Sequence, residues 1–109
     1  MNAKHEMIVC IVNAGFSDVA MDAARKLGAR GGTVAHARGT AGKEAEKLFG
    51  ITVQPEKEML LILVASEIRD DILHALYRAV GQDTPAQGFS FALPVDAVAG
   101  ISTAPQPEQ

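Results

Sequence analysis

The chain has 109 residues, with ten basic side chains, thirteen acidic ones and a net charge of −3. This length suits one domain, and the acidic balance excludes a protein whose affinity for nucleic acid comes from neutralising phosphates. The lone Cys10 excludes an intrachain disulfide and a Cys/His zinc pattern. We expect a cytoplasmic protein without membrane insertion, because no apolar run approaches about 18 residues and the first residues lack a signal-peptide pattern.

The first half of the sequence predicts a strand, a helix and a second strand. Met7–Asn13 is an apolar, β-branched run, which favours a strand buried on both faces. The helix that follows has Ser17 as its predicted N-cap and Gly28 as its predicted stop. The second strand is predicted over Thr33–Arg38, after two glycines.

The second half repeats this order after a polar segment. The predicted elements are a short helix over Lys43–Phe49, a strand over Met59–Val64, a helix over Glu67–Val80 and a strand over Phe89–Leu93. Ser66 is predicted to cap the longer helix, and Pro94 to limit the last strand. We expect the tail, residues 102–109, to be disordered.

The resulting βαββαβ order is typical of the α+β, ferredoxin-like fold, with a four-stranded antiparallel sheet and two helices on one face. The domain is predicted over residues 1–101. Both strongest strands are apolar at nearly every position, although the helices would cover only one sheet face. An uncovered face of this kind would be a large apolar patch. The sequence therefore predicts an oligomer that associates through this face.

Catalytic and metal-binding patterns are weak in this sequence. Cys10 lies inside an apolar strand, which favours an inert thiol, and the three histidines are spread over different elements. Gly39, Gly42 and Lys43 resemble a phosphate-binding loop, but the spacing of a Walker motif is missing. This stretch is either a backbone nest for an anion or a solvated loop.

Three stretches resemble the PII signal-transduction superfamily, in particular its small members with short loops. The first is GARGGTVAHARGT, residues 28–40, which is similar to the family's second strand and its exit. The second is PEKEMLLILV, residues 55–64, and the third is QGFSFALPVDAVAGI, residues 87–101. The likeness covers Met7 to about Ile101.

The resemblance implies a homotrimeric regulator and not an enzyme, with no permanent cofactor. Its members bind adenine nucleotides between subunits, so ATP, ADP or AMP is the implied effector. They control a membrane transporter or an enzyme through a T-loop, which corresponds here to residues 38–56. That segment contains no tyrosine, so the loop-tyrosine modification of some members has no counterpart.

The resemblance also implies a set of nucleotide-binding residues. Thr33 and Val64 match positions at the adenine and ribose, Arg38 and Gly39 match the T-loop base, and Gly88 matches the phosphate loop. The full predicted set is Thr33, Arg38, Gly39, Thr40, Gly42, Lys43, Val64, Gly88 and Phe89.

Three cations of the family pattern are replaced in this sequence. Phe89 stands where the family has a lysine, and Gly100 and Ser102 stand at the positions of two arginines. Because charge-assisted contacts are the strong ones, tight triphosphate binding would need compensation from Arg38, Lys43 or Lys57. Two alternatives stay open: a ferredoxin-like trimer with a metal-binding or enzymatic role, and an adaptor with a vestigial cleft.

Overall fold

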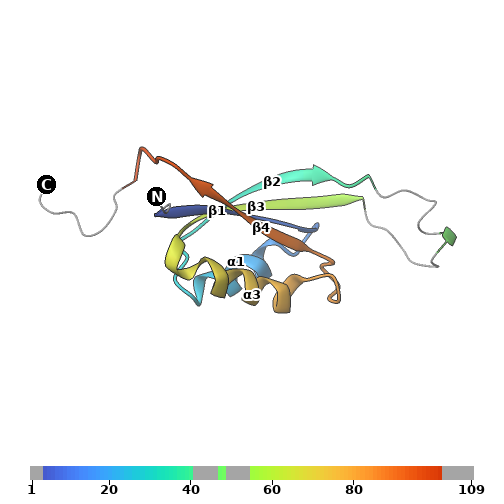
Figure 1. Cartoon of the computed structure of the whole chain (residues 1–109). Helices are drawn as coiled ribbons and strands as arrows, with labels where there is room; N and C mark the ends of the chain where they lie inside the picture. The colour runs from blue at the N-terminus through green and yellow to red at the C-terminus, as the bar shows by residue number, and fades with distance from the viewer. Residues whose placement is uncertain (1–3, 41–46, 49–54, 102–109) are drawn as a thin grey trace, which may run out of the picture.

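The computed structural model describes residues 4–40, 47–48 and 55–101. Its elements are β1 (His5–Asn13), α1 (Ser17–Arg25), β2 (Thr33–Arg38), β3 (Glu56–Ala65), a 3₁₀ turn (Ser66–Ile68), α3 (Arg69–Val80) and β4 (Phe89–Val95). The strands form one antiparallel sheet in the order β2-β3-β1-β4. Figure 1 shows both helices on the same side of this sheet. The predicted ferredoxin-like α+β fold is confirmed.

The core lies between the helices and one face of the sheet, which we call the covered face. Alternate residues of β1 and β3 point into it because successive side chains of a strand face opposite ways. The fully or almost fully buried strand residues are Ile8, Cys10, Val12, Leu60, Ile62 and Val64. α1 contributes Ala20 and Ala24, both 0% exposed, and these small side chains let the helix approach the sheet closely. α3 contributes Ile72, Leu76 and Val80.

The other side of the sheet, which we call the bare face, has no helix over it (Figure 1). The register places three cross-strand rows on this face. They are Met7 with Leu63 and Leu93, Val9 with Leu61 and Phe91, and Ile11 with Met59 and Phe89. In the single chain, Phe89, Phe91 and Leu93 are 41–52% exposed. The apolar uncovered face expected from the sequence is therefore present.

The predicted helix caps need correction at both N-termini. Ser17 is the first residue of α1 and not its N-cap, a position held by Phe16 without a side-chain cap bond. The acceptor comes instead from β3, where Glu58 Oε1 receives the backbone N–H groups of Gly15 and Ser17, each at 3.1 Å. Ser66 opens a 3₁₀ turn, and α3 begins only at Arg69. These helix starts depend on tertiary contacts that local sequence does not reveal.

The predicted stop of the first helix is confirmed. Gly28 has a φ of +112°, and the N–H groups of Gly28 and Ala29 donate to the carbonyls of Arg25 and Ala24 at 3.1 and 3.2 Å. This is the pattern of a helix that ends in a left-handed glycine.

Pro94 does not end the last strand, which continues to Val95. β4 lies at the edge of the sheet, where a residue without an N–H group is tolerated. Of the predicted short helix over Lys43–Phe49, only Lys47 and Leu48 are described, and both are helical. The rest of that prediction and the predicted disordered tail lie outside the described residues. No helix in the described part of the chain is long and apolar enough to cross a membrane.

Candidate functional site

The end of the sheet where β1 and β2 finish and β3 and β4 begin gathers most of the predicted site residues. Arg38 pairs with Glu56 across β2 and β3, Asn13 pairs with Lys57, and Gly88 precedes the start of β4. We call this the loop end of the sheet. Figure 1 shows β2 and β3 running out toward the segment that joins them at this end. The topology thus places the two ends of the 38–56 segment and the 81–88 loop at the same end of the sheet.

Asn13 connects two parts of the loop end through its side chain. Its Oδ1 accepts a hydrogen bond from Lys57 Nζ at 2.7 Å. Its Nδ2 donates to the Pro85 carbonyl at 3.0 Å and to Gln87 Oε1 at 3.4 Å. Asn13 is 5% exposed, so its polar atoms depend on these protein partners. The base of the 38–56 segment and the 81–88 loop are therefore joined through one buried amide.

The base of the 38–56 segment is closed tightly. The Gly39 N–H donates to the Pro55 carbonyl at 2.6 Å, one step beyond the Arg38–Glu56 pair. A Cβ at Gly39 would lie 2.9 Å from Lys57 Cε, so a larger residue would displace the lysine side chain. Gly39 thus has a packing role next to the cation that contacts Asn13.

The 81–88 loop is held by its own hydrogen bonds. Gln82 Nε2 donates to the carbonyls of Gln87 and Gly88 at 2.9 and 3.0 Å, and the Gly88 N–H donates to the Val80 carbonyl at 2.7 Å. A Cβ at Gly88 would lie 2.5 Å from that carbonyl oxygen, so only glycine fits. Gln87 adopts a φ of +47°, a conformation that side chains disfavour by about 1 kcal/mol. This loop is a fixed part of the fold.

The structure does not bring all predicted nucleotide-binding residues together in one protomer. Arg38, Gly39 and exposed Thr40 lie at the loop end, and so do buried Gly88 and half-exposed Phe89. Val64 is 3% exposed on the covered face. Thr33 pairs with Leu61 and so belongs to the bare face. Gly42 and Lys43 lie outside the described residues.

Two carboxylates on the covered face fix the start of one helix each. Glu58 of β3 receives the N-terminal N–H groups of α1, as described above. The pKa of its carboxyl is lowered from the ordinary 4.5, first because the Ser17 hydroxyl donates a hydrogen bond to it. Glu6 of β1 is 8% exposed and binds Arg69, the first residue of α3, with Oε2 and Nη1 2.8 Å apart.

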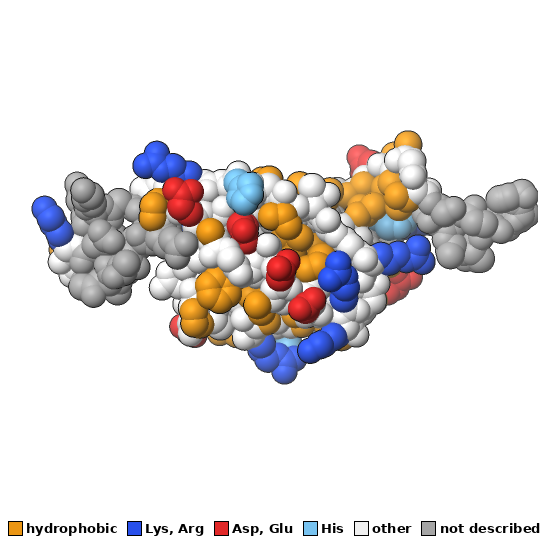
Figure 2. Space-filling model, turned by 180° about the vertical axis from the view of Figure 1, so that it is seen from behind, with side chains coloured by type: hydrophobic (Ala, Val, Ile, Leu, Met, Phe, Trp, Pro, Cys, Tyr) orange, Lys and Arg blue, Asp and Glu red, His pale blue; other side chains and the backbone are white. Residues whose placement is uncertain are grey.

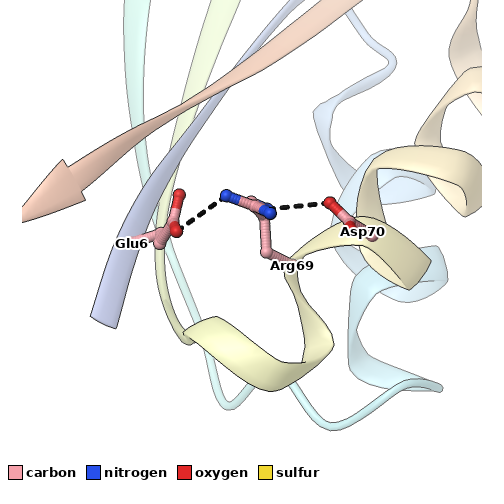
Figure 3. Close-up of polar contacts among 3 residues, drawn as sticks. All are labelled: Glu6, Arg69 and Asp70. Carbon is pink, nitrogen blue, oxygen red and sulfur yellow. Dashed lines mark hydrogen bonds and ion pairs between the residues drawn. The ribbon is translucent and has the colours of Figure 1, made fainter. Parts of the chain in front are cut away.

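Figure 3 shows Arg69 lying between Glu6 and Asp70. Its Nε donates to Asp70 Oδ1 at 2.8 Å. The pKa of the Arg69 guanidinium is raised, by the hydrogen bond with Asp70 first and that with Glu6 second. This cluster lies at the opposite end of the sheet from the loop end, because Glu6 pairs with Val64 and Pro94. Its contacts are those of an ion pair that anchors a helix.

Cys10 is 0% exposed, as predicted for an inert thiol. Burial raises the pKa of its thiol, and a hydrogen bond from Ser90 lowers it by a smaller amount. Among the described residues, no group of three or more His, Cys, Asp or Glu side chains is arranged to hold a metal ion. Figure 2 shows acidic and basic side chains mixed over the face seen there, with hydrophobic groups between them.

The comparisons with known proteins agree with this fold. The chain is similar to Arabidopsis thaliana PII bound to citrate, with a TM-score of 0.69 and 22% identity over 92% of this chain and 82% of that one. It is also similar to a protein of Thermus thermophilus described as a putative PII-like signalling protein, with a TM-score of 0.64 and 17% identity over 87% and 90% of the two chains.

A third similar structure is a protein of unknown function from Pediococcus pentosaceus. It has a TM-score of 0.64 and 15% identity over 91% of this chain and 99% of that one. No protein-family model and no curated protein matches the sequence. At these identities the likeness establishes the fold: this chain is folded as PII and PII-like proteins are.

Sequence reasoning missed the linking role of Asn13 and the capping role of Glu58. In the sequence, Asn13 is the last residue of an apolar strand, and its partners Pro85 and Gln87 lie 72 and 74 residues away. The sequence signal for this link is a polar amide at the end of a buried strand. The sequence indicates Lys57 only as a compensating cation, whereas its contact with Asn13 gives it a fixed position at the loop end.

Proposed function

We propose that this chain is a PII-like signalling protein. It would assemble as a homotrimer through the bare face, bind a small anionic effector such as ATP, ADP or AMP near the loop end, and control a transporter or an enzyme through the 38–56 segment. The observation that carries the proposal is the PII fold with an uncovered apolar sheet face and a long segment inserted between β2 and β3.

The bare face supports the oligomeric part of the proposal. Its three apolar rows run across β3, β1 and β4, and the β4 positions are about half exposed in the single chain. Burying apolar surface stabilises by about 25 cal/mol per Å², so this face favours association. The proposed number of three subunits comes from the family likeness and not from the geometry of the single chain.

The effector part rests on the loop end. Lys57 and Arg38 are cations at the base of the 38–56 segment, and Asn13 joins Lys57 to the 81–88 loop. The Lys57 ammonium group has three N–H donors, so an anion would bind it beside Asn13, and the charge of the anion would pull the lysine away from the neutral amide. Binding would therefore alter the contact between the two parts of the loop end, which is what a sensor with a movable segment needs.

Titration calorimetry with ATP, ADP and AMP tests the site. We expect one of them to bind, and Lys57→Met to weaken it by about tenfold or more, because a charged hydrogen bond is lost. Lys26→Met is the matched control, since Lys26 lies in the exposed turn after α1, and it should leave affinity unchanged. Absence of heat and of any shift in melting temperature at millimolar nucleotide would contradict the sensing role.

A further inference from the structure

A cavity of about 220 Å³ lies between α3 and β4, at the edge of the sheet. α3 supplies Leu73, Leu76 and Tyr77 to its lining, and β4 supplies Phe89 and Ser90. The remaining lining residues come from the connecting loop and are Gly81, Gln82 and Gly88. This cavity is distinct from the Lys57–Asn13 contact, although it shares Gly88 and Phe89 with the predicted nucleotide site.

The lining is suited to an uncharged ligand. It contains the Tyr77 ring and two leucine side chains, and no ionisable group other than the Tyr77 phenol. Phe89 borders the cavity as the first residue of β4, while its side chain belongs to the bare face. Transfer of a charged group into such surroundings is costly without a partner. The polar groups available are neutral: the Nε2 of Gln82 donates to the loop carbonyls, and the Oε1 of the same amide is able to accept a hydrogen bond.

The wall formed by the connecting loop is rigid. Gln82 and the N–H of Gly88 hold the loop to itself and to Val80, as described above. Side chains are excluded at Gly81 and Gly88, because a Cβ at either would overlap a neighbouring carbonyl oxygen. The cavity therefore exists before any ligand arrives, which reduces the entropy lost on binding.

We propose that this cavity binds one uncharged planar aromatic ring system. An apolar cavity of about 150 Å³ accommodates benzene, so 220 Å³ gives room for a single ring or a compact fused pair. Tyr77 is 62% exposed. Its ring supplies aromatic surface at the cavity, and aromatic ring pairs prefer offset or edge-to-face packing.

Indole is the probe, and the full chain is titrated with it while amide resonances are followed by NMR. We expect saturable shifts at Tyr77, Gln82, Gly88 and Ser90, and much weaker binding of benzoate, which carries a charge. Tyr77→Ala should weaken indole binding by about two- to tenfold, the usual worth of one aromatic contact. Leu73→Trp should abolish it by filling the cavity.

Leu93→Ala is the matched control, since Leu93 is a half-exposed apolar residue of β4 that does not line the cavity. It should leave indole affinity unchanged. Indole shifts confined to the bare face, or lost in Leu93→Ala but kept in Tyr77→Ala and Leu73→Trp, would overturn the proposal. An ATP titration of the same samples distinguishes the two proposed sites. If indole binds and ATP does not, the result contradicts only the proposed effector site.

Discussion

The two faces of the sheet are built from the same strands, yet they have different surroundings. On β3, Ile62 points to the covered face and is 0% exposed, whereas its neighbours Leu61 and Leu63 point to the bare face and are partly exposed. Both faces are apolar, but the helices supply partners for only one of them. The difference indicates that the strands carry more apolar surface than one protomer can bury.

The helices are held to the covered face by two carboxylates as well as by packing. Glu58 of β3 binds the N-terminus of α1, and Glu6 of β1 binds Arg69 at the start of α3. The three apolar rows of the bare face contain no such charged anchor. One face is thus specified for helices of the same chain, and the other is left for a further apolar surface.

The largest expected effect comes from comparing adjacent residues of β3. Ile62→Ala should lower the free energy of unfolding by about 2–5 kcal/mol, because it opens a cavity in the core. Leu63→Ala should cost less in an isolated protomer, and its cost should grow with protein concentration if the bare face is an interface. Urea unfolding at two protein concentrations measures both. Equal, concentration-independent losses would show that the faces do not differ.

A smaller effect is expected at the anchor of α3. Arg69→Met leaves the nearly buried Glu6 without its partner, so it should lower the melting temperature clearly, because a buried carboxylate without a partner is costly. Asp70→Ala removes only an exposed carboxylate from the same arginine, so a change within about 0.5 kcal/mol is expected. Thermal unfolding of the two variants provides the comparison. A larger loss for Asp70→Ala would mean that Glu6 does not anchor the helix.

The smallest effect concerns the anchor of α1 and depends on pH. Because the folded pKa of Glu58 lies below its ordinary value of 4.5, its contribution is present above about pH 4.5. It is lost as the pH falls through the lowered folded pKa. Glu58→Ala should cost about 1 kcal/mol at pH 7, as for a lost helix cap, and less at low pH.

Glu58→Gln separates charge from hydrogen bonding, since its amide oxygen still accepts. It should retain part of the stability at pH 7 and show a flatter pH profile below pH 4.5, the ordinary pKa of the carboxyl group, because the amide does not titrate. Unfolding curves recorded across that range test this. A profile identical to that of the unmodified protein would mean that the Glu58 carboxylate does not supply the pH dependence.

The sequence was sufficient to predict the order of the strands and helices, because their periodicity and glycine stops are local features. It also predicted the apolar bare face, because residues 7–12 are all apolar and successive side chains of a strand point to opposite faces of the sheet. The helix caps could not be predicted, because Glu58 lies 41 residues from Ser17. The extension of β4 through Pro94 depends on its edge position in the sheet, which only the strand order reveals.

The sequence indicated some residues of the loop end and missed others. The glycine and arginine at the base of the 38–56 segment follow the family pattern and lie at the loop end, and their part in binding an effector stays a prediction. The Asn13 link could not be seen, because it depends on Lys57 and the 81–88 loop meeting at one strand end. The side chain of Val64 lies in the core, so the single chain does not present this side chain to a ligand.

The mass of the protein in solution tests the assignment of the bare face most directly. Light scattering coupled to size-exclusion chromatography should give three times the chain mass of 11.5 kDa. Leu63→Glu, which places a charge on the bare face, should reduce the particle to the mass of one chain while circular dichroism stays unchanged. A single-chain mass for the unmodified protein, or a trimer that survives Leu63→Glu, would contradict an interface at this face.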